Sequence, residues 1–143
     1  VKLADFGLAT QLGSTPTMST CVGSPYWMPP EVIEGAHASL LSDIWSLGCT
    51  VVELYTGKPP YDSVPPMVAM FRIVEDSTPP FPKDNMSSEM QAFLSGCFQK
   101  QVSNRSTAEE LQRHPWIQSK TAKKTMTRVS SVMDLKQVLV EHN

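Results

Sequence analysis

The segment that follows Ser42 constrains the fold more than any other part of this sequence. Its apolar residues recur at helical spacing and also fill the other faces; they are Ile44, Trp45, Leu47, Cys49, Val51, Val52, Leu54 and Tyr55. A helix that is apolar on most sides belongs in the centre of a protein. Ser42 is a favourable N-cap, Gly57 is a favourable residue after the last turn, and Pro59-Pro60 prevents continuation. The sequence therefore predicts a central helix over 43–56 that needs packing partners on most sides.

Three further helices are predicted downstream of this segment. The first covers 66–75, where Pro66 suits the first turn and one apolar stripe is formed by Met67, Met70, Phe71 and Val74. The second covers 88–99, with apolar residues at Met90, Phe93, Leu94, Cys97 and Phe98. The third opens with the capping box Thr107-x-x-Glu110 and should end before His114-Pro115.

The remaining segments are short or irregular. A strand is predicted over 1–4, and a hydroxyl-rich loop follows it over 8–22. Pro25, Pro29 and Pro30 exclude a continuous helix across 23–30. Residues 118–143 form a basic tail or linker, weakly amphipathic over 132–140. The predicted fold class is mainly α.

Composition excludes several classes of function. The chain has 143 residues and a net charge of −2, which suggests one domain and gives no electrostatic basis for a nucleic-acid partner. No apolar run is long enough to span a membrane. Its three cysteines, Cys21, Cys49 and Cys97, have neither disulfide-framework nor zinc-site spacing. A reducing compartment fits this usage, so a cytoplasmic location is expected.

Four sequence blocks occur together in a fixed order. They are DFG at 5–7, CVGSPYWMPPEVIEG at 21–35, SDIWSLGCTVVELYTGKPPYD at 42–62, and NRS with HPWI near the end. In this order and at these spacings they resemble the C-terminal lobe of a eukaryotic protein kinase over residues 1–117. Within that family, VGSPYWMPPEVIEG and PPMVAMFRIVEDSTPPFP are most similar to the STE group, near MAP kinase kinase kinases and septation or cytokinesis kinases. The resemblance implies the C-terminal lobe of a fold that is α+β overall, truncated before the DFG segment.

The resemblance assigns cofactor and metal roles to the first block. Asp5 would chelate the magnesium ion on ATP and is thereby the expected catalytic and metal-binding residue. Phe6 would pack beneath it, and Gly7 would let the backbone swing. Carboxylate oxygen is the kind of ligand that magnesium prefers. Without the later blocks, Asp5 would read as an ordinary turn carboxylate.

The second block implies a phosphorylation site and a substrate site. Thr20 is the first expected phosphorylation site, with Ser19 and Thr17 as neighbours, modified by an upstream kinase or by autophosphorylation. The run Gly23, Ser24, Pro25 and Tyr26 resembles the P+1 segment, which cradles the substrate residue after the phosphoacceptor. Ser24 is the Ser/Thr-kinase form of that segment and is the second expected catalytic residue, although the family more often has Thr there.

Three residues are expected to be structural. The resemblance pairs Glu31 with Arg105, and it makes Asp43 an anchor for the catalytic loop. Two departures from the family pattern lie beside the pair, since Pro29 replaces an alanine and Ser106 replaces a proline. As an acid in a first turn, Asp43 also complements the helix dipole.

The chain lacks the Gly-rich loop, the strand lysine with its glutamate partner, and the H-R-D-x-x-x-x-N segment. The expected parent is a Ser/Thr protein kinase that uses ATP and Mg²⁺ on a protein substrate in a signalling cascade. This polypeptide alone is expected to be inactive, and to aggregate or bind dye through exposed apolar surface. The alternative is a non-catalytic kinase-like scaffold or interaction module. A third possibility is regulation through the tail, where Arg128 precedes Ser130 and Ser131.

Overall fold

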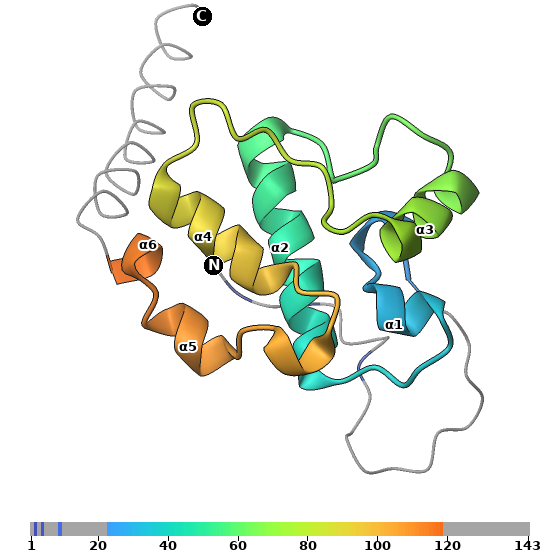
Figure 1. Ribbon diagram of the computed structural model, residues 1–143, viewed down its shortest axis with the longest axis horizontal. Coiled ribbons are helices and arrows are strands. Elements are labelled where there is room, and N and C mark those ends of the chain that lie inside the picture. Colours follow the sequence, from blue (N-terminus) through green and yellow to red (C-terminus); the bar gives the residue numbers. More distant parts are fainter. Residues whose placement is uncertain (1, 3, 5–8, 10–22, 119–143) are drawn as a thin grey trace, which may run out of the picture. The chain divides into compact units, whose positions relative to one another are not determined.

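The computed structural model describes residues 2, 4, 9 and 23–118, and this part of the chain is helical (Figure 1). Its elements are η1 (Pro25–Trp27), α1 (Pro30–Ile33), α2 (Leu40–Thr56), α3 (Pro66–Glu75), α4 (Ser88–Cys97), η2 (Val102–Asn104), α5 (Ala108–Gln112) and α6 (Pro115–Gln118). No described residue is in a strand. Lys2 and Ala4 are the described residues of the predicted strand 1–4, and neither is in a strand. The chain divides into two compact units, Val1–Thr107 and Ala108–Asn143.

The central helix α2 is longer at its start than the sequence pattern predicted. Its N-cap is Ser39, whose Oγ accepts hydrogen bonds from the backbone N–H groups of Leu41 and Ser42 at 3.2 and 3.3 Å. Ser42, predicted as the N-cap, lies in the third helical position instead. The prediction was wrong because Ser39 and Ser42 form a capping box together, and the outer serine begins the helix. The predicted end is confirmed, since Gly57 follows the last turn with a φ of 82°.

Helices α2 and α4 lie side by side and form the core of the first unit (Figure 1). The Trp45 and Phe98 rings meet edge to face, with centroids 5.3 Å apart. At Gly48 the two helices approach so closely that an added Cβ would lie 2.8 Å from the Cβ of Cys97. The predicted apolar residues of the 88–99 helix are all buried; they are Met90, Phe93, Leu94, Cys97 and Phe98. The helix itself ends at Cys97 rather than at residue 99.

Helix α3 has the predicted bounds but buries a different face. It packs beside η1 and α1, and its buried residues are Ala69 and Ile73. Two members of the predicted stripe are instead largely exposed, Met67 at 75% and Phe71 at 68%. Packing against η1 and α1 decides which face is buried, and that face carries Ala69 and Ile73. The exposed surface of α3 consequently combines large apolar side chains with Arg72 and Glu75.

The second unit contains α5 and α6. Helix α5 begins directly after Thr107 and ends before His114-Pro115, as the sequence predicted. Helix α6 was not predicted; Pro115 occupies its first position, which needs no backbone N–H. The predicted amphipathic stretch 132–140 lies outside the described residues. Among the helices that the structure describes, none combines the length and apolarity needed to cross a bilayer.

Candidate functional site

The structure describes part of the predicted site. Asp5, Phe6 and Gly7 lie outside the described residues, as do the predicted phosphorylation sites Thr17, Ser19 and Thr20. Magnesium binding by Asp5 therefore stays a prediction. Residues 2, 4, 9 and 23–118 contain no group of three or more His, Cys, Asp or Glu side chains that could hold a metal ion.

The described substrate segment begins with an exposed, extended backbone. Gly23 has a φ of 135°, a conformation that favours glycine, and an added Cβ would lie 3.3 Å from Cε of Met28. Ser24 is exposed and extended, with φ −80° and ψ 126°. Its carbonyl accepts the backbone N–H of Trp27 at 3.2 Å, whereas its hydroxyl makes no capping bond to the helix it precedes. The backbone of Ser24 is thus held by η1, and the residue is exposed.

Three hydrogen bonds fix η1 to the rest of the first unit. The Tyr26 hydroxyl donates to the carbonyl of Val64 at 2.9 Å, in the loop that leads to α3. The Trp27 indole Nε1–H donates to Glu53 Oε2 at 3.2 Å, and Ser46 Oγ donates to the Trp27 carbonyl at 2.7 Å. Glu53 and Ser46 both belong to α2. The segment predicted to receive substrate is thereby attached to the central helix.

Glu31 belongs to α1, the helix that follows this segment, and forms an ion pair with Arg105. Arg105 Nη1 lies 2.7 Å from Glu31 Oε1, and Nη2 lies 2.9 Å from Oε2. Arg105 is only 3% exposed, and two of its other donors bond to backbone carbonyls: Nη1 donates to the Leu41 carbonyl at 2.7 Å and Nε to the Gln99 carbonyl at 3.0 Å. Its guanidinium also lies 5.2 Å from the ring centroid of Trp45. The ion pair anticipated from the sequence is therefore present and joins α1, α2 and the end of α4.

The neighbouring Arg105 and Ser42 side chains control the protonation of Glu31. Burial of the carboxyl acts to raise its pKa, but hydrogen bonds from Arg105 and Ser42 and the charge of Arg105 outweigh burial and lower the pKa below 4.5. Glu31 is accordingly an anion throughout the neutral range. The contacts of its carboxylate are with Arg105 and Ser42, and the structural role expected for the pair stays a prediction.

Asp43 lies in the first turn of α2 and is exposed. It makes no hydrogen bond or ion pair with another described residue. Asp43 was predicted to complement the helix dipole, and its place in the first turn agrees with that prediction. Its role as an anchor for a catalytic loop stays a prediction.

Two cysteines of the first unit are free and buried, Cys49 and Cys97. Burial raises the pKa of the Cys49 thiol far above its ordinary value, and burial likewise raises the pKa of Cys97 to about 12. Neither thiol is ionised at neutral pH, so neither is a candidate nucleophile.

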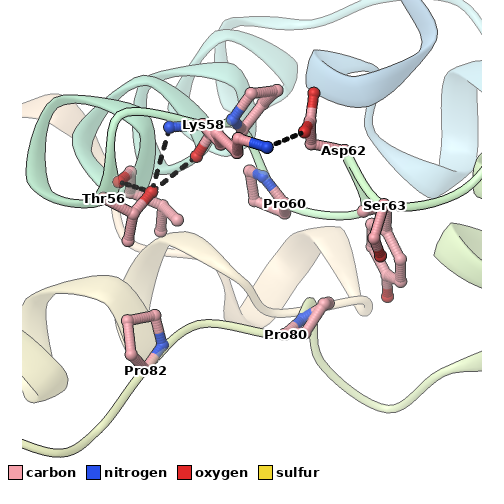
Figure 2. A pocket seen from close by; sticks show the side chains of 10 residues that line it. Thr56, Lys58, Pro60, Asp62, Ser63, Pro80 and Pro82 are labelled. Atoms are coloured by element: carbon pink, nitrogen blue, oxygen red, sulfur yellow. Dashed lines mark hydrogen bonds and ion pairs between the residues drawn. The ribbon is translucent and has the colours of Figure 1, made fainter.

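The described residues of the first unit also form an open pocket of about 350 Å³ (Figure 2). Its lining comes from the end of α2, the loop after it and the segment before α4; the residues are Val52, Thr56, Lys58, Pro59, Pro60, Tyr61, Asp62, Ser63, Pro80 and Pro82. Lys58 and Asp62 form an ion pair of 3.2 Å at its edge (Figure 2). No predicted site residue lines this pocket.

The sequence did not predict two side-chain contacts made by serines of the central helix. Ser42 was predicted only as an N-cap, and Ser46 carried no signal beyond its low helix propensity. Both direct their hydroxyls at the preceding segment, Ser46 to the Trp27 carbonyl and Ser42 to Glu31 Oε1 at 3.0 Å. The only usable signal was the presence of small polar residues in an otherwise apolar helix.

Comparison with known families gives one matching model, the protein kinase domain, over residues 1–117. Among curated proteins, cytokinesis protein sepH of Aspergillus niger is 54% identical over 117 residues, covering 82% of this chain and 9% of the relative. Cell division control protein 7 of Schizosaccharomyces pombe is 51% identical over 117 residues, covering 82% of this chain and 11% of the relative. MAP3K epsilon protein kinase 1 of Arabidopsis thaliana is 51% identical over 120 residues, covering 83% of this chain and 9% of the relative. The chain thus spans about a tenth of the length of these relatives.

Proposed function

Because this chain belongs to the protein kinase family, we propose that it supplies the C-terminal lobe of a Ser/Thr protein kinase, which transfers the γ-phosphate of ATP to hydroxyl groups of proteins. The observation that carries the proposal is the bidentate pair of Arg105 with Glu31 of α1, the helix that follows the segment 23–27 in the sequence. Phosphoryl transfer depends mainly on positioning and electrostatic stabilisation, and this pair supplies a fixed base for a substrate segment.

Each predicted residue has a defined task in this proposal. Asp5 would hold magnesium, which would neutralise charge on the phosphates when ATP is bound. Ser24 presents its hydroxyl toward the reacting groups, while Gly23, Pro25 and Tyr26 shape the surface for the residue that follows the phosphoacceptor. Phosphorylation of Thr20, or of Ser19 or Thr17, adds negative charge that orders the preceding segment by pairing with cationic side chains.

The names of the relatives support a narrower placement. Proteins described as a cytokinesis protein, a cell division control protein and a MAP3K epsilon kinase share about half of their matched residues with this chain. We place the chain near MAP kinase kinase kinases and septation kinases, with a role in a signalling cascade and a cytoplasmic location. An upstream kinase or autophosphorylation activates it.

The test compares two polypeptides for phosphorylation of a general protein substrate with Mg-ATP. The 143-residue chain alone contains no H-R-D-x-x-x-x-N segment, so it should show no turnover. The full-length protein encoded by the complete reading frame should be active, and Asp5→Asn should abolish that activity. Full-length protein that is folded yet inactive with either residue at position 5 would refute the kinase proposal.

A second candidate is a non-catalytic interaction module. The observation that favours it is the exposed apolar surface of α3, which includes Met67, Val68 and Phe71. The same experiment separates the two candidates, because an interaction module remains inactive at full length and is indifferent to Asp5→Asn.

A further inference from the structure

Ser42 is a buried polar residue whose hydroxyl is used in two directions. The side chain is in the first turn of α2, and the residue is 4% exposed. Its Oγ accepts the backbone N–H of Ser39 at 2.9 Å and lies 3.0 Å from Glu31 Oε1. An ionised carboxylate only accepts hydrogen bonds, so the single O–H of Ser42 is donated to Glu31.

This arrangement closes a ring of contacts around the ion pair. Glu31 Oε1 receives both the Ser42 hydroxyl at 3.0 Å and Arg105 Nη1 at 2.7 Å. The same Arg105 nitrogen donates to the carbonyl of Leu41 at 2.7 Å, which returns the ring to the first turn of α2. The start of α2 therefore contacts both members of the pair, Glu31 through Ser42 and Arg105 through Leu41.

The serine does more than a capping residue does. In an ordinary capping box the third helical residue only returns a hydrogen bond to the N-cap backbone, and that bond is present here between Ser42 and Ser39. The added bond to Glu31 connects this cap with α1, and α1 directly follows the segment 23–29. Several amides in this region are protected by short-range hydrogen bonds, including those of Trp27, Met28 and Val32.

We propose that Ser42 is a positioning residue whose hydroxyl couples the N-terminal cap of α2 to the Glu31–Arg105 pair and so fixes the segment 23–33. The consequence for substrate binding rests on the proposed kinase function. The coupling itself is a property of the fold and can be measured without catalysis.

The experiment is hydrogen–deuterium exchange on the full-length protein, resolved over peptides 26–36, 39–44 and 88–98. Three variants divide the network. Ser42→Ala removes the contacts of the hydroxyl with Glu31, with the Ser39 backbone N–H and with Ser39 Oγ at 3.4 Å. Ser39→Ala removes the cap but keeps a hydroxyl for Glu31, and Ser42→Thr keeps the hydroxyl at position 42. Thr50→Ala is the matched control, because Thr50 is exposed on the same helix and its hydroxyl bonds only to the carbonyl of Ser46.

Ser42→Ala should speed exchange in 26–36 by about tenfold, as expected for loss of a hydrogen bond to a charged group, and leave 88–98 unchanged. Ser39→Ala should speed exchange mainly in 39–44, while Thr50→Ala and Ser42→Thr should match the parent. Exchange in Ser42→Ala that rises only in 39–44 would mean that Ser42 is a cap and nothing more, and the proposal fails. If Ser42→Ala does not fold, parent-like exchange in Ser42→Thr supports the role of the hydroxyl, and faster exchange in 26–36 of Ser42→Thr contradicts it.

Kinetics then test the link to substrate. Ser42→Ala should raise the KM for a protein substrate several-fold and leave the KM for ATP unchanged, whereas a general loss of stability would change both. If Ser42→Ala speeds exchange in 26–36 but leaves the KM for the protein substrate unchanged, the coupling between Ser42 and Glu31 stands. That result would refute the proposal that this segment binds substrate. Full-length protein that lacks activity without any substitution would refute the proposed function and leave the exchange result standing.

Discussion

Glu31 and Arg105 are 74 residues apart in the sequence, yet their side chains meet through two parallel contacts of 2.7 and 2.9 Å. Arg105 is buried, and every nitrogen of its guanidinium has a partner. Such a charge cannot lose its partner without remaining in a poorly solvated position. The pair therefore links α1 to the residues after α4 within the first unit.

Breaking this pair should destabilise the first unit strongly. Replacing Glu31 by Ala leaves the buried Arg105 unpaired, which typically costs about 3–5 kcal/mol. Urea unfolding followed by circular dichroism measures the change. Replacing Glu109, whose contact with Arg113 is exposed, by Ala is the control and should change the free energy of unfolding by less than about 1 kcal/mol. A loss of similar size in both variants would contradict this account of the pair.

Stability should also fall in acid because of Glu31. The pKa of this carboxyl is lowered in the folded protein, so the folded state favours the charged form. Its contribution is fully present above the unfolded value near 4.5 and is lost as the pH falls through the lower folded value. Unfolding free energies measured from pH 7 to pH 3 should therefore decline below about 4.5, and Glu31→Gln should flatten the decline. An equally steep decline in Glu31→Gln would assign the effect to other carboxylates.

Gly48 should not tolerate even alanine. An added Cβ would lie 2.8 Å from Cys97 Cβ and 2.9 Å from the Phe98 ring, so α2 and α4 would have to separate. Overpacking of this kind typically costs about 1–3 kcal/mol. The thermal midpoint of Gly48→Ala should drop, although alanine is the better helix former. Thr50→Ala, on the exposed side of α2, should remain within about 0.5 kcal/mol of the parent.

The buried thiols should be unreactive while the fold is intact. Burial raises the pKa of Cys97 to about 12 and that of Cys49 further, so thiolate is scarce at pH 7. In a Cys21→Ser background, a thiol-specific reagent should label neither residue rapidly under native conditions and both after unfolding in denaturant. Fast labelling of the native protein would show that α2 and α4 separate readily.

The 143-residue chain should bind a hydrophobic dye and associate. Leu40, Leu47 and Leu54 recur every seven residues along α2, and all three are exposed, Leu54 by 83%. Contiguous exposed apolar surface promotes association. Leu54→Ser should lower dye fluorescence and the apparent mass by light scattering relative to the parent chain. A soluble monomer with a sharp thermal transition and no dye binding would contradict the expectation.

Local patterns predicted the helices well because capping and proline effects act within a few residues. Gly57 ends α2, Pro66 begins α3 and Thr107 precedes α5, each at the predicted place. The N-cap of α2 and the buried face of α3 were predicted wrongly. The N-cap error was local, because Ser39 and Ser42 form a capping box and the outer serine begins the helix. The buried face of α3 depends on neighbours distant in sequence, which decide whether Ala69 or Phe71 faces inward.

The sequence by itself determined the central helix through its helical periodicity, and it determined the family through the order of its motifs. The resemblance to that family, and no local pattern, implied which two charges pair. Tertiary structure alone decided that Ser42 would join the Glu31 carboxylate and that Ser46 would hold the Trp27 carbonyl. A serine hydroxyl can bond to any acceptor within reach. Only the packing of α1 and η1 against α2 places those acceptors about 3 Å away, and no spacing along the chain encodes that proximity.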